Sequence, residues 1–129
     1  MISFEEFILE DEGPIYLQII RYIKRGIAAG TISNLEELPS RRVLSAYLGV
    51  NPNTIQKAYR ILEEEGLISS HSGAKSCIHL DAEKAMAVRE QLLRDDTGEW
   101  VRAMKQMGIP REQALGLAQQ MWEATTEET

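Results

Sequence analysis

Amide and cationic side chains gather on one side of a short segment between residues 51 and 64. Asn and Gln amides form paired hydrogen bonds with base edges, whereas Lys and Arg contact phosphates or guanine. At the helical repeat, four such side chains share the outer face: Asn53, Gln56, Lys57 and Arg60. This pattern predicts a surface that binds nucleic acid.

These side chains can share one face only on a helix, and the sequence of the segment carries the signals of a helix. Asn51 is a good N-cap, and Pro52 falls at the first helical position, where its missing N–H removes no hydrogen bond. The side opposite the polar face is apolar: Ile55, Ala58, Tyr59 and Leu62. We therefore expect an amphipathic helix packed on a core.

A shorter helix precedes it and carries two arginines in its first turn. Ser40 is its N-cap, and Gly49 suits the tight turn that follows it. Its expected buried face is Leu44, Tyr47 and Leu48. Because a cation at a helix N-terminus is disfavoured by the dipole, a phosphate or base partner explains Arg41 and Arg42 better than solvent does. The two helices together predict a helix-turn-helix.

The elements around this pair complete a winged helix-turn-helix domain over residues 14–80. A helix is expected over 14–29, with isoleucines repeating every four residues, and a β-hairpin follows the second helix of the pair. The hairpin, or wing, would bring three residues near the sugar-phosphate backbone: Ser72, Gly73 and Lys75. Residues 1–13 form an acidic arm with apolar residues, which either docks on a neighbour or frays.

Charge is unevenly distributed along this acidic chain of net charge −6. Residues 1–12 hold five acidic and no basic residues, residues 13–80 hold eight basic and five acidic, and residues 81–129 hold six basic and ten acidic. The expected DNA-binding domain is thus locally basic. The absence of a long apolar run or a signal peptide, together with a single cysteine, predicts a cytoplasmic protein that does not enter a membrane.

Residues 81–129 are expected to form a helical dimerisation region. The pattern predicts helices over about 82–95 and from about 99, separated by a break at Thr97–Gly98, and a last helix opened by Pro110. So short a segment cannot easily bury its apolar stripes alone, so a second copy is their simplest partner. The expected interface is Val88, Leu92, Trp100, Val101, Met104, Leu117 and Met121. Trp100 and Trp122 could instead line a pocket for a small-molecule effector at that interface, although plain packing is the default.

Four motifs give the span from Pro14 to Leu80 its resemblance to the GntR family of bacterial transcription regulators. They are PIYLQI at 14–19, LPSRR at 38–42, LGVNPNTIQKAY at 48–59 and LEEEGLI at 62–68. The second helix of the pair would be the recognition helix, and its NPNT start looks most like the YtrA subfamily. The resemblance implies a mainly α fold with a small hairpin, a helical dimerising extension, and repression of a transporter-type operon. The implied contacts to double-stranded DNA are Arg42, Asn51, Asn53, Thr54, Gln56, Ser72 and Gly73. Many family members have Arg at the position of Pro52, so one contact is absent here.

Other chemistries find little support in the sequence. His71, Cys77 and His79 lack zinc-ligand spacing, so no metal site is expected. No nucleophile set, phosphate loop or cofactor loop is present, so neither an enzyme nor a cofactor is expected. The alternative function is a winged helix used only for protein–protein contact.

Overall fold

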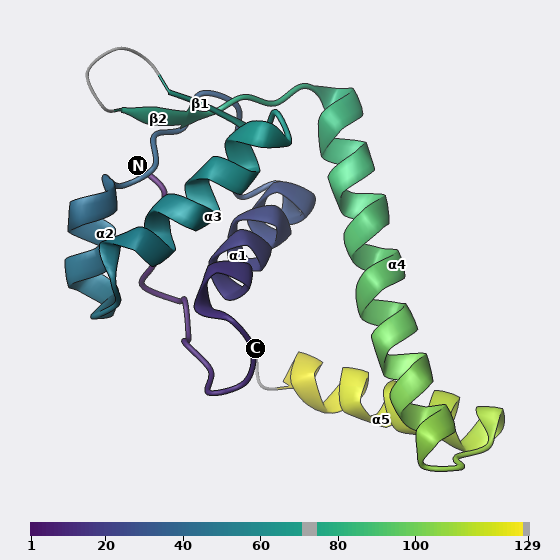
Figure 1. Cartoon of the computed structure of the whole chain (residues 1–129). Helices are drawn as coiled ribbons and strands as arrows, with labels where there is room; N and C mark the ends of the chain where they lie inside the picture. The colour runs from purple at the N-terminus through teal and green to yellow at the C-terminus, as the bar shows by residue number, and fades with distance from the viewer. Residues whose placement is uncertain (71–74, 128–129) are drawn as a thin grey trace. The chain divides into compact units, whose positions relative to one another are not determined.

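The computed structural model describes residues 1–70 and 75–127, with side chains described as far as Thr125. The chain forms two compact units, Met1–Leu92 and Leu93–Thr129. The elements of the first unit are shown in Figure 1, where α3 packs against both α1 and α2. No helix among the described residues is long and apolar enough to cross a membrane.

Helix α1 spans Ile15–Ala29 and supplies one wall of the core. Its buried residues are Ile19, Ile20, Ile23 and Ile27, the stripe that the four-residue repeat predicts. The helix starts after Pro14 and ends at Gly30, whose φ of 80° is the left-handed conformation that glycine adopts without strain.

The N-terminal arm, residues 1–13, packs against α1 and the segment before α2 within the first unit. Ile2 and Phe4 are buried in the core, and the Ile2 amide donates to the Glu37 carbonyl at 2.8 Å. The Tyr22 hydroxyl of α1 donates to the Ser3 carbonyl at 2.7 Å, and the rings of Phe4 and Tyr22 lie 4.9 Å apart between centroids. The arm therefore contributes apolar side chains to the core rather than fraying.

Helices α2 (Arg41–Leu48) and α3 (Pro52–Glu64) form the expected pair. The Ser40 hydroxyl accepts from the Val43 amide at 3.1 Å, and the Asn51 side-chain carbonyl accepts from the Asn53 amide at 2.8 Å. Both predicted N-caps are confirmed. Gly49, with φ of 69°, makes the turn between them.

The buried face of α3 matches the prediction, but that of α2 is narrower than expected. Ile55, Ala58, Tyr59 and Leu62 of α3 are all buried. In α2, Leu44 is buried and Leu48 half-buried, whereas Tyr47 is 60% exposed. Placing Tyr47 on the buried face was wrong. At 100° per residue it lies on the side of Leu44 away from Leu48, and a two-turn helix needs only the Leu44–Leu48 row to pack.

The wing is a two-stranded antiparallel hairpin. Strand β1 is Ile68–Ser70 and strand β2 is Ser76–Ile78, with Ile68 opposite Ile78 and Ser70 opposite Ser76. Both isoleucines are buried in the core, which fixes the register because a shift of one residue would turn them to solvent. The fold is thus a winged helix, mainly α with one small hairpin, as the sequence predicts.

One long helix replaces the two expected after the wing. Helix α4 runs without interruption over Ala82–Gln106, so the predicted break at Thr97–Gly98 is wrong. A glycine costs only about 1 kcal/mol relative to alanine in a helix interior, which good helix formers on both sides outweigh. The chain turns at Gly108, with φ of 70°, where the pattern also predicts a stop, and helix α5 spans Arg111–Glu127.

Candidate nucleic-acid interface

The apolar side of α3 is packed in the core, so the opposite, polar side of the helix faces solvent. The side chains of Asn53, Gln56, Lys57 and Arg60 are exposed, and Thr54 is half-buried. Because the opposite face is fully packed, this helix cannot roll to hide its polar side. The expected amide and cationic face is therefore rigidly displayed.

Asn51 has a structural duty as well as a place beside this face. Its side-chain oxygen is occupied by the Asn53 amide, an arrangement that stabilises a helix start by about 1 kcal/mol. Its side-chain NH₂ group still offers donors. A contact from Asn51 to DNA would therefore use this nitrogen.

Arg41 and Arg42 lie in the first turn of α2, and both are exposed. No acidic residue accompanies them in that turn, so they carry positive charge at the positive end of the helix dipole. An anion bound there would interact favourably with the positive end of the helix dipole and would reduce the repulsion between the two arginines. This arrangement suits a DNA phosphate.

Tyr59 ties the two helices of the pair together. Its hydroxyl donates to the Pro39 carbonyl at 2.7 Å, so the middle of α3 is bonded to the residue before the α2 cap. Burial raises the pKa of Tyr59 well above its ordinary value of 10.0, while the charge of Arg41 opposes that rise. The phenol therefore stays a hydrogen-bond donor at neutral pH.

Lys57 has a partner that the sequence did not indicate. Its Nζ atom lies 4.1 Å from the centroid of the Tyr16 ring, which is at the start of α1. The distance is within the range of a cation–π interaction. Spacing within α3 cannot reveal a contact with α1; the only signal was an aromatic residue early in that helix.

The wing adds one described cation. Lys75 lies just before β2, and its Nζ is 3.8 Å from a carboxylate oxygen of Glu37. Both side chains are well exposed, so the pair contributes about 0–1 kcal/mol at most and leaves Lys75 able to turn to a phosphate. Ser72 and Gly73, the other expected wing contacts, lie outside the described residues.

The acidic residues of α3 lie at the end away from its cap. Glu65, which follows the helix, pairs with Lys24 of α1 at 3.0 Å, and Glu64 lies 3.8 Å from Arg60. The carboxylates are therefore partly neutralised, and the first two turns of α3 carry no acid. The charge pattern favours an anionic partner at the N-terminal half of α3.

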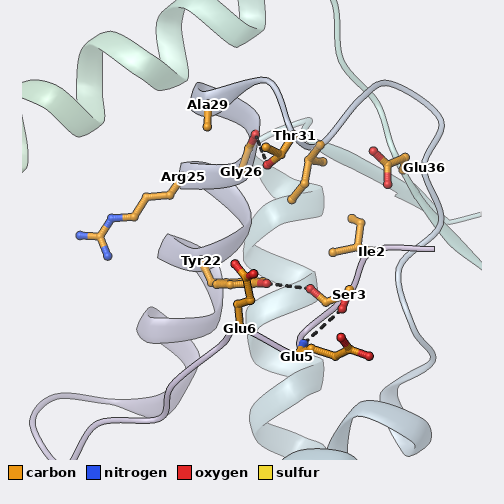
Figure 2. Close-up of a pocket in the computed structure, with 11 residues that line it drawn as sticks. Ile2, Ser3, Glu5, Glu6, Tyr22, Arg25, Gly26, Ala29, Thr31 and Glu36 are labelled. Carbon is orange, nitrogen blue, oxygen red and sulfur yellow. Dashed lines mark hydrogen bonds between the residues drawn. The ribbon is translucent and has the colours of Figure 1, made fainter. Parts of the chain in front are cut away.

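A separate hollow of about 460 Å³ lies between the arm and α1. Figure 2 shows Ile2, Ser3 and Glu6 of the arm beside Tyr22 of α1, with the hydrogen bond from Tyr22 to Ser3 dashed. Burial, and then the charge of Glu6, raise the pKa of Tyr22, which keeps that phenol protonated. None of the residues that line this hollow belongs to α2 or α3, so it is no part of the interface.

The second unit carries the expected apolar residues. Trp100, Val101 and Met104 of α4 line a hollow of about 330 Å³ together with Ala114 and Leu115 of α5. Larger apolar side chains on α5 are exposed: Leu117 by 42%, Met121 by 66% and Trp122 by 79%. By contrast, Val88 belongs to the first unit, where it packs against the core, and Leu92 is half-buried.

No cluster of metal-ligating side chains occurs among the described residues. Cys77 is a free, half-buried thiol in β2. His71 lies outside the described residues.

Known proteins resemble this chain in both sequence and structure. The family model of the bacterial regulatory proteins of the gntR family matches residues 15–76. YhcF of Bacillus subtilis, an uncharacterized HTH-type transcriptional regulator, is 32% identical over 102 residues, which are 79% of this chain and 84% of that protein. YtrA of the same organism, an HTH-type transcriptional repressor, is 38% identical over 85 residues, which are 61% of this chain and 65% of YtrA.

Solved structures agree with the sequence matches. A GntR family transcriptional regulator from Listeria monocytogenes superposes with a TM-score of 0.74 at 31% identity, over 87% of this chain and 98% of that one. YtrA from Sulfolobus acidocaldarius, a GntR-family transcription factor, gives 0.54 at 34% identity, over 74% and 99%. These relatives are regulators and not enzymes, which confirms that expectation. The chain belongs to the gntR family of bacterial regulatory proteins and is a DNA-binding transcriptional regulator of the winged-helix type.

Proposed function

We propose that this chain is a dimeric, sequence-specific repressor that binds a palindromic operator. The observation that carries the proposal is the face of α3 formed by Asn53, Gln56, Lys57 and Arg60, exposed on a helix whose other side is locked in the core. In this proposal α3 enters the major groove, where Asn53 and Gln56 read base edges. Thr54, half-buried beside them, contributes its hydroxyl.

Backbone contacts would come from the cations around that face. Arg41 and Arg42 at the start of α2 would neutralise phosphates beside the groove, and Lys75 of the wing would contact the sugar-phosphate backbone. Ser72 and Gly73 belong to the same proposed wing contact. The repressor role is supported by the likeness to Bacillus subtilis YtrA, itself named a repressor. The family resemblance supports a transporter-type operon as the target and a cytoplasmic setting.

The second unit provides the dimer in this proposal. One recognition helix reads too few base pairs for a genomic search, whereas two copies read half-sites about 34 Å apart. Met121 and Leu117 are exposed on one side of α5, and an isologous interface would bury them. Val88 and Leu92, also expected in the interface, are half-buried and keep exposed surface that a second copy could cover.

A small-molecule effector is a second candidate role for this unit. The hollow beside Trp100, Val101 and Met104 has a volume of about 330 Å³, and pockets of this size hold small ligands. Its apolar lining favours an apolar or aromatic compound.

Salt dependence separates DNA binding from the alternative of a winged helix used only for protein contact. The affinity of the full chain for a labelled duplex should fall linearly with salt on a log–log plot, with a slope of about −0.9 for each phosphate neutralised. Arg42→Ala should make the slope shallower by about 0.9, the contribution of one phosphate contact. Arg94→Ala removes the same charge from an exposed site on α4 and should leave the slope unchanged. No binding at low salt to any duplex would reject the proposal.

A further inference from the structure

Lys57 stands apart from the other cations of the interface because an aromatic ring holds it. Its Nζ lies 4.1 Å from the centroid of Tyr16, the second residue of α1, while the lysine itself belongs to α3. Tyr16 is half-buried and packs against the core, so its ring has a fixed base, and Lys57 is exposed. The contact therefore joins a rigid platform to a flexible side chain.

The ring face acts on the lysine in two ways. The negative face of the π system attracts the ammonium. This attraction restricts the flexible four-carbon side chain of the lysine to the side of α3 that faces α1. It also leaves ammonium hydrogens free, because the ring covers only one side of Nζ and the group has three donors. A lysine ordered in this way loses less rotamer freedom when it contacts an anion.

We propose that Tyr16 is a positioning residue that pre-orders Lys57 for a contact with a DNA phosphate. The inference rests on the proposed function and assigns Lys57 a different duty from its neighbours Asn53 and Gln56. A lysine ammonium is a compact point charge that does not favour the paired geometry by which amides read bases. Held at the α1 side of the recognition face, it supplies affinity and salt dependence rather than base preference.

A double-mutant cycle on the full-length chain tests this assignment. Tyr16→Leu should weaken binding to an operator duplex about two- to tenfold, because Lys57 must then be ordered at the moment of binding. In the Lys57→Ala background, where no ammonium remains to be placed, Tyr16→Leu should cause no further loss. Lys57→Ala should make the log–log salt slope shallower by about 0.9 and weaken operator and mismatched duplexes by the same factor.

Tyr16→Phe is the matched control, since it keeps the ring and removes the hydroxyl. Its affinity should stay within about twofold of wild type, because the ring face carries the interaction. Circular dichroism should show the same helical content in all variants; if Tyr16→Leu fails this check, Tyr16→Met, which also lacks a π face, replaces it in the cycle with the same expected losses.

Several outcomes overturn the inference. If Tyr16→Leu causes an equal loss of operator affinity in both backgrounds, or no loss in either, Tyr16 and Lys57 are not coupled in DNA binding. A loss in Tyr16→Phe as large as that in Tyr16→Leu would assign the role to the hydroxyl. A tighter complex for Tyr16→Leu would mean that the ring withholds Lys57 from DNA. All three require that the wild-type chain binds its operator; if it binds no duplex at all, the proposed function itself fails, and the inference with it.

Discussion

The Tyr59 hydroxyl donates a hydrogen bond of 2.7 Å to the Pro39 carbonyl, across the gap between the two helices of the DNA-binding pair. Tyr59 is buried in the middle of α3, and Pro39 comes directly before the cap of α2. The bond therefore sets the spacing between the arginines at the start of α2 and the amides on α3. An apolar residue at position 59 would fill the core but leave the Pro39 carbonyl without this donor.

The burial of Tyr59 should appear in the pH dependence of stability. Burial raises the pKa of Tyr59 above 10.0, so above about pH 10 the unfolded chain releases this proton first and the folded state loses stability. Below that pH both states hold the proton and the contribution is complete. The free energy of unfolding should fall by up to about 1.4 kcal/mol per pH unit from this group.

Tyr59→Phe isolates the effect. It should lower stability by about 1–3 kcal/mol at pH 7, since a buried carbonyl loses its partner, and should flatten the alkaline decline. Tyr22, whose pKa is also raised, titrates in both proteins and cancels from the difference. Urea unfolding of both chains between about pH 7 and pH 11 measures this. Parallel alkaline declines in the two proteins would refute the assignment.

Base readout should depend on two amides of α3. Gln56→Ala and Asn53→Ala should each weaken operator binding by about 1–3 kcal/mol and relax the preference at one base pair. Gln106→Ala removes an exposed amide from the end of α4 and should leave affinity unchanged. Anisotropy titrations with operator and single-substitution duplexes give both quantities. A uniform loss on every sequence would mean that the amides contact only the backbone.

Two helical glycines should respond to alanine in opposite ways. A Cβ at Gly26 would lie 2.7 Å from Cγ1 of the buried Ile32. Gly26→Ala should therefore destabilise α1 by about 1–2 kcal/mol, although alanine has a higher helix propensity than glycine. At Gly98 the nearest atom is Nη1 of Arg102 at 3.4 Å, a side chain that can move. Gly98→Ala should stabilise α4 by about 0.5–1 kcal/mol. Hydrogen exchange of the surrounding amides reports each change, and equal signs at the two sites would contradict the packing described.

The proposed dimer should depend on the exposed stripe of α5. Met121→Asp places a charge in the expected interface and should shift the chain toward monomer in sedimentation at micromolar concentration. Because Met121 is 66% exposed in the single chain, the change should leave helical content intact. Gln119→Asp, on the opposite side of α5, is the control and should remain dimeric. A wild-type chain that is already monomeric under these conditions would refute the proposed dimer.

Local signals in the sequence predicted the caps, the turn and the apolar face of α3 in the DNA-binding pair. Ser40, Asn51, Pro52 and Gly49 act through their own backbone neighbours, so their roles can be predicted from spacing alone. The sequence does not predict the uninterrupted α4, because Gly98 resembles a helix break although the helix propensity of the residues around it outweighs its cost.

Long-range contacts explain the remaining differences. Tyr47 is exposed because a two-turn helix buries one row, and the meeting of Tyr16 with Lys57 depends on how α1 lies against α3. Nor can periodicity within residues 1–13 reveal that Ile2 and Phe4 enter the core, because their partners lie elsewhere in the chain. Such contacts follow from the fold and not from local pattern.

Selection of duplexes from a random pool by the full-length wild-type chain is the decisive test of whether this protein reads DNA sequence through α3. We expect enrichment of a two-fold symmetric motif whose half-site centres are about 10 base pairs, or a small multiple of that, apart. The same selection with Gln56→Ala should lose information at one position in each half-site. A pool that shows no enriched motif at low salt, while the chain remains folded, would contradict the claim that this protein reads DNA sequence through α3.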